Sequence, residues 1–247
     1  MSDVVLETAS QRLARDRFFL WMSALIVFFA FGGFTPTYFA PMAEGTLREF
    51  SPAVHLHGLL FFLWTLLLLL QTSLVARRSM SAHRSFGMAG ISLATAMVIL
   101  GLVVNFQVNE ARIEIGEVDI GYTLGFFGTS AVIAFGAMFG LAVKNINRPD
   151  CHKRWMLLGT AALLNAPLVR LFSPMFGGVE SVPFALNLAA YAVVPIACLI
   201  YDWRTLGRIH VVTLFGCTIL AGRIVLTATI TGTQVWRNFY DGLLTMA

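Results

Sequence analysis

The most informative shortage in this chain is of charge. Only 12% of its 247 residues are charged, whereas 57% are hydrophobic, and the mean hydropathy is +0.77. A soluble domain carries about 25% charged residues. The composition therefore excludes an ordinary soluble protein and is typical of a chain embedded in a lipid bilayer.

Cysteine and lysine are also scarce, and common catalytic motifs are missing. The three cysteines show no C-x-x-C spacing, which argues against a disulfide framework and against a thiolate zinc site. The only lysines, Lys144 and Lys153, lie at the ends of apolar runs, so no span offers the lysine that a retinal Schiff base needs. The chain has no Walker A sequence, no G-x-S-x-G turn and no H-E-x-x-H pair, which excludes the classes that depend on them.

Long apolar runs dominate what is present. Seven segments are each long enough to cross a bilayer, which takes about 20 helical residues. They are residues 18–38, 52–76, 85–106, 121–143, 154–173, 182–201 and 210–231. The loops between them are short. We therefore predict an all-α integral membrane bundle of seven transmembrane helices, folded as a single domain over residues 1–247.

The basic residues are divided unevenly between the two sets of loops. Most of the 17 precede the first span or follow the second, fourth and sixth spans, whereas most acidic residues lie in the other loops. Because lysine and arginine collect in cytoplasmic loops, we predict an N-terminus inside, a C-terminus outside and a multi-pass location in a bacterial cytoplasmic (inner) membrane. The basic charge then reflects topology, so the expected partner is the lipid bilayer and not nucleic acid.

Two histidines lie in the first turns of the second predicted span. Ser51 and Pro52 suit the start of a helix, which places His55 and His57 at the outer side. Residues two apart lie about 200° apart around a helix, so the rings point to different faces unless the helix end unwinds. The pair is a candidate ligand set for copper or zinc. Alternatively, both histidines are membrane-interface residues.

A polar stripe continues along the same helix. His57, Trp64 and Gln71 recur every seven residues and share one face. Such a stripe is expected to face protein or a cavity, because hydrocarbon cannot satisfy its hydrogen bonds. Trp64 and Gln71 therefore join the candidate site. The alternative is that His57 and Trp64 are interface residues and that Gln71 only binds a neighbouring helix.

Three further histidines each lie at the cytoplasmic start of a span. His83, His152 and His210 begin the third, fifth and seventh spans, so we expect them at a similar depth. Imidazoles from different helices at one level could bind a metal ion or haem iron, for which histidine is a common ligand. The alternative is that each histidine marks the headgroup boundary as part of the positive-inside pattern.

Two arginines lie within predicted spans. Arg170 should share a helix face with His152 about 27 Å away, near the outer boundary, and Arg223 lies about 20 Å along its helix from His210. A charge at the depth of Arg223 costs roughly 3 kcal/mol or more, and no predicted span contains Asp or Glu. We expect Arg223 to bind backbone carbonyls, water, an outer-loop carboxylate, or a ligand such as a haem propionate, a lipid phosphate or a quinone.

The motifs H-x-H-G, W, Q, H-R-x-x-G and H-K-R-x-M follow one another through the second to fifth spans. Their residues are His55, His57, Gly58, Trp64, Gln71, His83, Arg84, Gly87, His152, Lys153, Arg154 and Met156. This pattern resembles a set of uncharacterised bacterial multi-pass membrane proteins, which implies a shared fold but no established chemistry. A more distant similarity is to b-type cytochromes, and it implies paired histidines on facing helices around haem. Only the inner side of this chain offers histidines on more than one helix.

These observations support one leading hypothesis and two alternatives. The leading hypothesis is a membrane redox or electron-transfer protein that binds haem b through His83 and His152, with His210 as an alternative or supporting group. Quinone or a redox partner protein would exchange electrons with it. The second hypothesis is a non-catalytic transition-metal-binding or assembly protein that uses His55 and His57. The third is a transporter or lipid-binding protein centred on Arg223.

Overall fold

The structure is a computed structural model that describes the backbone of residues 9–245 and the side chains of residues 17–245. Arg12 and Arg15 of the predicted cytoplasmic cluster lie outside the described side chains. The described elements are α1 (Ala9–Phe34), the π-helix η1 (Thr35–Phe39), α2 (Ala40–Ala43), α3 (Pro52–Ala76), α4 (Met80–Glu114), α5 (Val118–Lys144), α6 (Pro149–Ala161), α7 (Asn165–Phe176), the 3-10 helix η2 (Val179–Ser181), α8 (Phe184–Leu206), α9 (Val211–Ile230) and α10 (Gln234–Leu244). The all-α prediction is confirmed for this part of the chain.

Six of the helices in the described part of the chain are long and apolar enough to span a bilayer, and the number becomes seven if α6 and α7 form one broken span. The sequence predicted one continuous span at 154–173. The structure instead has two helices that meet at a 45° bend. Pro167 lies in the first turn of α7 and has no N–H to donate to the carbonyl four residues earlier, which favours a break before α7. The predicted number of seven spans is therefore reached only if α6 and α7 are counted together as one span.

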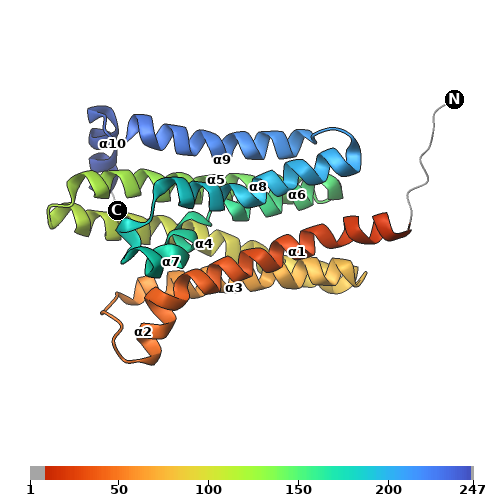
Figure 1. Cartoon of the computed structure of the whole chain (residues 1–247), viewed down its shortest axis with the longest axis horizontal. Helices are drawn as coiled ribbons and strands as arrows, with labels where there is room; N and C mark the ends of the chain where they lie inside the picture. Colours follow the sequence, from red (N-terminus) through yellow and green to blue (C-terminus); the bar gives the residue numbers. More distant parts are fainter. Residues whose placement is uncertain (1–8, 246–247) are drawn as a thin grey trace.

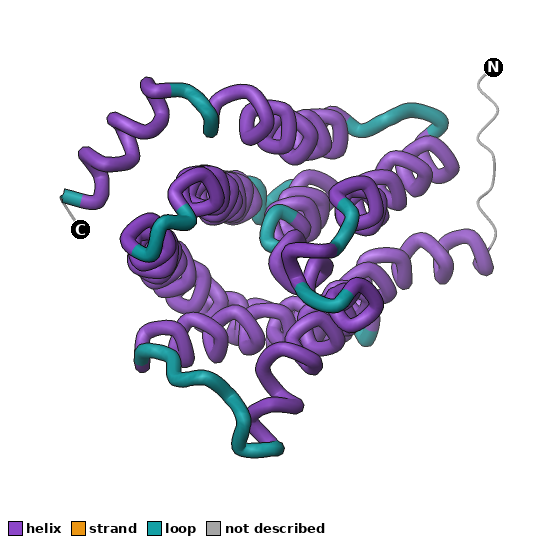
Figure 2. Tube along the Cα trace, turned by 60° about the vertical axis from the view of Figure 1, so that its left-hand side comes forward, coloured by secondary structure: helices purple, strands orange, loops and turns teal. Residues whose placement is uncertain are grey.

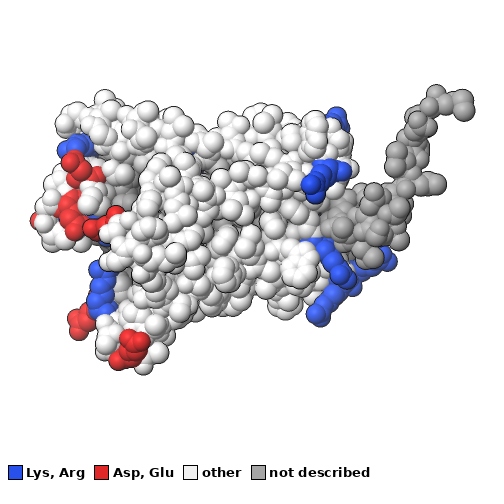
Figure 3. All heavy atoms as spheres, in the orientation of Figure 1, with Lys and Arg blue, Asp and Glu red and all other residues white. Residues whose placement is uncertain are grey.

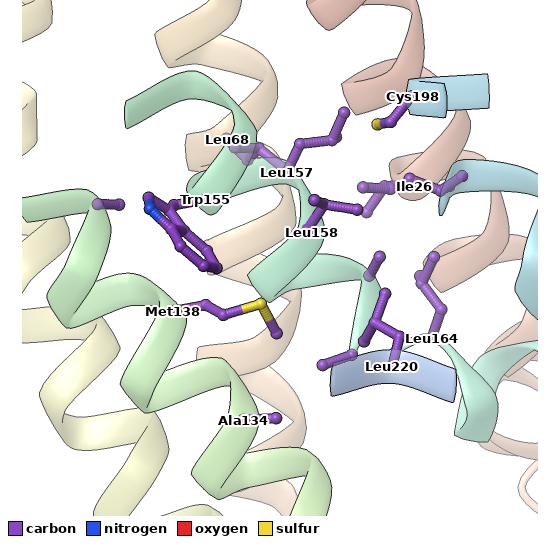
Figure 4. Packing of buried hydrophobic residues seen from close by; sticks show 14 of the residues in the cluster. Ile26, Leu68, Ala134, Met138, Trp155, Leu157, Leu158, Leu164, Cys198 and Leu220 are labelled. Carbon is purple, nitrogen blue, oxygen red and sulfur yellow. The ribbon is translucent and has the colours of Figure 1, made fainter. Parts of the chain in front are cut away.

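The helices run side by side along the long axis of the molecule, and α5 lies among α4, α6 and α9 (Figures 1 and 2). On the other side, α1 packs against α3 and α7. The main core forms where α6 and the following turn enter the bundle. Figure 4 shows the side chains of Leu157, Leu158 and Leu164 lying among those of Ile26, Met138 and Leu220.

The charged side chains separate toward the two ends of the bundle (Figure 3). Acidic side chains gather at the end that carries α2 and α10, and most visible basic side chains lie at the opposite end, from which α1 begins. The described ends of the chain also lie at opposite ends of the bundle (Figure 1). This arrangement agrees with the charge pattern of the loops, whereas the inside and outside assignment remains a prediction.

Close packing of α4 on α5 depends on Gly128. A Cβ atom added at Gly128 would overlap the side-chain oxygen of Asn105. Asn105 Nδ2 donates hydrogen bonds to the carbonyl oxygen of Gly125 at 3.1 Å and to Thr129 Oγ1 at 3.0 Å. The glycine therefore makes room for a polar side chain that links the two helices, as small residues do in membrane interfaces.

We expect Gly128→Ala to lower the free energy of unfolding by about 1–3 kcal/mol, because Asn105 must move and lose its partners. The measurement is thermal unfolding of the purified protein in detergent. Gly140→Ala is the matched control, since it lies on the same helix and an added Cβ meets nothing within 4 Å. Equal melting temperatures for the two variants would contradict the packing role of Gly128.

Candidate functional site

The structure brings together two of the three inner histidines. His83 lies in the first turn of α4 and His152 in the first turn of α6. Their ring centroids are 6.4 Å apart and the ring planes are nearly perpendicular, at 87°. Both helices begin at the basic end of the bundle, so the predicted common depth of these two residues is realised in the fold.

The two rings differ in their hydrogen bonds. His152 Nδ1 lies 2.9 Å from the carbonyl oxygen of Ala142, which can only accept, so Nδ1 carries a proton and Nε2 of the neutral ring has the lone pair. The Nδ1 atom of His83 is buried and has no hydrogen-bond partner among the described residues.

A third polar side chain lies beside this pair. Gln71 on α3 is only 9% exposed, and its Oε1 is buried without a hydrogen-bond donor in the described part of the chain. A Cβ added at Gly87, one turn after His83 on α4, would lie 3.6 Å from Gln71 Nε2. The Gln71 amide therefore packs against the α4 face that carries His83. Three helices thus contribute Gln71, His83 and His152 to one cluster.

This arrangement matches the chemistry of metal-binding histidines. Such residues usually donate one ring N–H to a carbonyl or carboxylate and bind the metal through the other nitrogen. Two imidazoles bound to opposite sides of one ion, with metal–nitrogen distances of about 2.0–2.1 Å, have ring centres roughly 6 Å apart. The ring centres of His83 and His152 are separated by 6.4 Å, which is close to that distance. Among the described residues no group of three or more His, Cys, Asp or Glu side chains could hold a metal, so any site here is a two-histidine site with an amide oxygen nearby.

His210 has a different position and role. Its Nδ1 accepts a hydrogen bond from the backbone N–H of Val212 at 3.1 Å and so caps the start of α9. Its backbone N–H donates to Asp202 Oδ2 at 3.1 Å. Burial and the nearby Arg154 guanidinium both lower the pKa of His210 below its ordinary 6.5, which favours the neutral ring that the cap requires. The structure therefore does not place His210 in the two-histidine cluster.

A buried ion pair lies beside that cap, and sequence reasoning missed it. Arg154 is 2% exposed and Asp202 is fully buried. Arg154 donates from Nε to Asp202 Oδ1 at 3.0 Å, and its Nη2 also bonds to that oxygen. The predicted span at 182–201 stopped just before this carboxylate, because α8 continues to Leu206 and includes Asp202 near its end. Gly207, which ends α8 with a φ of 66°, was the available sequence signal for this boundary.

Arg223 is bonded to the protein on several sides. It is 5% exposed and donates from Nε to Ser130 Oγ at 3.1 Å. Nη1 donates to the Ala162 carbonyl at 3.3 Å and to the Tyr191 hydroxyl at 3.0 Å, and Nη2 donates to the Phe127 carbonyl at 2.9 Å. The sequence left several kinds of partner for the Arg223 guanidinium open, and the structure shows that it binds backbone carbonyls. Arg223 therefore joins α5, α8 and the break between α6 and α7.

Arg170 lies apart from this network. Its Nη1 donates to the Ala166 carbonyl at 2.9 Å within α7, and its guanidinium lies 4.9 Å from the centre of the Phe34 ring. The sequence placed Arg170 and His152 on one face of a continuous helix. That expectation was wrong, because the bend separates α6, with His152, from α7, with Arg170.

The outer histidines have separate neighbours. His55 Nδ1 lies 2.6 Å from the Tyr38 hydroxyl, whereas the His57 ring lies 4.2 Å from the ring centre of Phe61. Their rings therefore point to different surroundings, as expected for residues two apart on a helix. Among the described residues they belong to no group of three or more His, Cys, Asp or Glu side chains that could hold a metal, and a copper or zinc site at His55 and His57 stays a prediction.

Trp64 belongs to the packing between helices. It is 2% exposed, and its Nε1 donates to Thr160 Oγ1 on α6 at 3.1 Å. Its ring packs edge-on against Phe135 and Phe139 of α5. Trp64 therefore faces protein and links α3 to α6.

No protein-family model, curated protein or solved structure matches this chain. The class of protein consequently rests on the fold and composition, which define a multi-pass helical membrane protein with six or seven spans. The resemblance over the second to fifth spans remains a prediction.

Proposed function

We propose that this chain is a membrane-embedded redox protein that binds a metal centre between His83 and His152. The observation that carries the proposal is the pairing of two rings from different helices, with Nδ1 of His152 bound to the Ala142 carbonyl and Nδ1 of His83 buried without a partner among the described residues. A haem b iron, which needs two axial ligands, or a single transition-metal ion fits this donor set. The bound metal would supply one-electron chemistry.

The protein's own residues would set the properties of that centre. The Ala142 carbonyl fixes the tautomer of His152 and orients its ring. Arg84, beside His83, and the other basic residues of this end suit the carboxylates of a haem. We place this end on the cytoplasmic side of a bacterial inner membrane and take a lipid-soluble quinone as the electron partner.

The proposal is tested by the absorption spectrum and metal content of protein purified from haem- and metal-replete cells. We expect a Soret band or a stoichiometric transition metal, and we expect His83→Ala and His152→Ala each to reduce it at least about tenfold, because a single imidazole remains. His55→Ala is the matched control, since His55 lies at the opposite end of α3 from Gln71 and contacts Tyr38.

Two results would contradict the proposal. One is a colourless, metal-free protein that takes up neither haem nor metal on reconstitution. The other is cofactor that persists in the His83→Ala/His152→Ala double variant. Loss of bound metal in His55→Ala alone would instead favour the outer-site alternative.

A further inference from the structure

Three arginines form a group at the acidic end of the bundle, the end that carries α2 and α10. Arg48 is in the loop between α2 and α3, Arg112 is in the last turn of α4, and Arg170 is in α7. Figure 3 shows basic side chains beside the acidic ones at this end. The positive-inside pattern explains the basic residues of the opposite end, but it does not explain these arginines.

Two of the three arginines stack on the rings of one connected aromatic cluster. The Arg170 guanidinium lies 4.9 Å from the ring centre of Phe34, the last residue of α1. The Arg48 guanidinium lies 4.5 Å from the ring centre of Phe50. The Phe50 ring is 6.4 Å from that of Tyr38, which belongs to the π-helix η1 directly after Phe34. Because η1 also packs on α7, the loop with Arg48 and the helix with Arg170 meet at this cluster.

The protein does not balance the charge of this group. The positive charges of Arg48 and Arg112 both act on the Arg170 guanidinium. Arg112 Nη1 bonds to Glu117 Oε2 at 2.5 Å. Among residues 17–245, neither Arg48 nor Arg170 forms an ion pair with a carboxylate, although acidic side chains gather at this end. Three cations therefore share one carboxylate.

The guanidinium groups also have unused donors. Arg170 is half-buried, and only one of its five N–H groups, on Nη1, forms a hydrogen bond with the described residues, to the Ala166 carbonyl at 2.9 Å. Stacking on a ring leaves the edge of a guanidinium open, and the Nε–Nη2 edge has the fork geometry that matches two oxygens of one anion. Arg48 is exposed and donates no hydrogen bond to the described chain. An anion can therefore approach both groups from outside the bundle without any movement of the fold.

We infer that Arg170 and Arg48 bind the phosphate group of an anionic phospholipid in the leaflet at this end. The two guanidinium groups would donate charge-assisted hydrogen bonds to the phosphate oxygens, and Arg112 adds positive charge. Arg48 and Phe50 directly precede α3, so the site lies near the end of a membrane span, where lipid head groups begin. This position and the aromatic surroundings favour a lipid phosphate over a dissolved one. A head group with net negative charge is favoured over a zwitterionic one, because two of the cations have no counter-ion.

The test measures lipid binding to purified full-length protein in detergent by native mass spectrometry. The probes are dilauroyl phosphatidylglycerol, which is anionic, and dilauroyl phosphatidylcholine, which adds a cation to the same phosphate. We expect Arg170→Gln and Arg48→Gln each to weaken binding of one phosphatidylglycerol molecule at least about tenfold, because a hydrogen bond between charged groups is lost. Phosphatidylcholine binding should stay unchanged in both variants. Arg170→Lys should recover only part of the affinity, because an ammonium lacks the planar fork.

Arg237→Gln is the matched control, since it removes an arginine at the same end that is bonded to Asp119 and lies outside the group. It should bind phosphatidylglycerol like the parent, which also accounts for anionic lipid bound at the basic end. Arg48→Gln keeps the inference testable if Arg170→Gln does not fold, because Arg48 is exposed. Parental phosphatidylglycerol binding in both variants, or the same loss in Arg237→Gln, would overturn the inference. Radiolabelled inorganic phosphate that binds the parent in equilibrium dialysis as tightly as phosphatidylglycerol would instead show that the ligand is a dissolved anion.

Discussion

Asp202→Ala is expected to lower the free energy of unfolding by about 3–5 kcal/mol, because it leaves the buried Arg154 guanidinium without its carboxylate. The same change removes the acceptor of the His210 backbone N–H and loosens the turn between α8 and α9. Thermal unfolding in detergent, followed by circular dichroism, measures the effect.

Two comparisons distinguish a buried pair from ordinary charge loss. Asp150→Ala removes a carboxylate that is 74% exposed, bonded to Lys153 at 2.8 Å and 3.7 Å from Arg154 Nη1, so its expected cost is at most about 1 kcal/mol. The Arg154→Leu/Asp202→Leu double variant removes both charges and should be more stable than Asp202→Ala. If the Asp202→Ala and Asp150→Ala proteins have the same melting temperature, the Arg154–Asp202 ion pair does not stabilise the fold.

Arg223→Leu is expected to destabilise the protein by about 1–3 kcal/mol. It leaves the buried Ala162 carbonyl without the Arg223 donor, whereas the Phe127 carbonyl keeps the hydrogen bond from Ser130 Oγ. This loss, together with that of the Ser130 and Tyr191 contacts, outweighs the relief of burying one fewer charge. Arg223→Lys should recover only part of the stability. A lysine ammonium lacks the planar fork of the guanidinium, so it cannot donate to α5, α8 and the α6–α7 break at the same time.

The measurement is again thermal unfolding, read together with protease resistance of the region 162–164 that joins α6 and α7. Arg208→Leu is the matched control, since Arg208 is exposed in the turn before α9. An Arg223→Leu protein as stable as the parent would contradict a structural role for these hydrogen bonds.

The sequence by itself determined the class of protein and most of the helices. Apolar runs of about 20 residues must satisfy their backbone groups internally in lipid, so they become helices wherever they occur. The spans predicted at 52–76 and 210–231 agree with α3 and α9 almost to the residue. His83 and His152 could also be selected as candidates, because both follow basic loops and should lie at one depth.

Only the tertiary structure decided which of these residues meet. Arg154 and Asp202 are 48 positions apart, and the partners of Arg223 are 32 to 96 positions away. The histidines His83 and His152 pair, whereas His210 caps a helix, although all three looked alike in sequence. Hydropathy and helical periodicity report the surroundings of one helix at a time. The rotation of each helix, the break before α7 and the pairing of buried polar groups depend on contacts between helices, and the packing of the bundle sets those contacts.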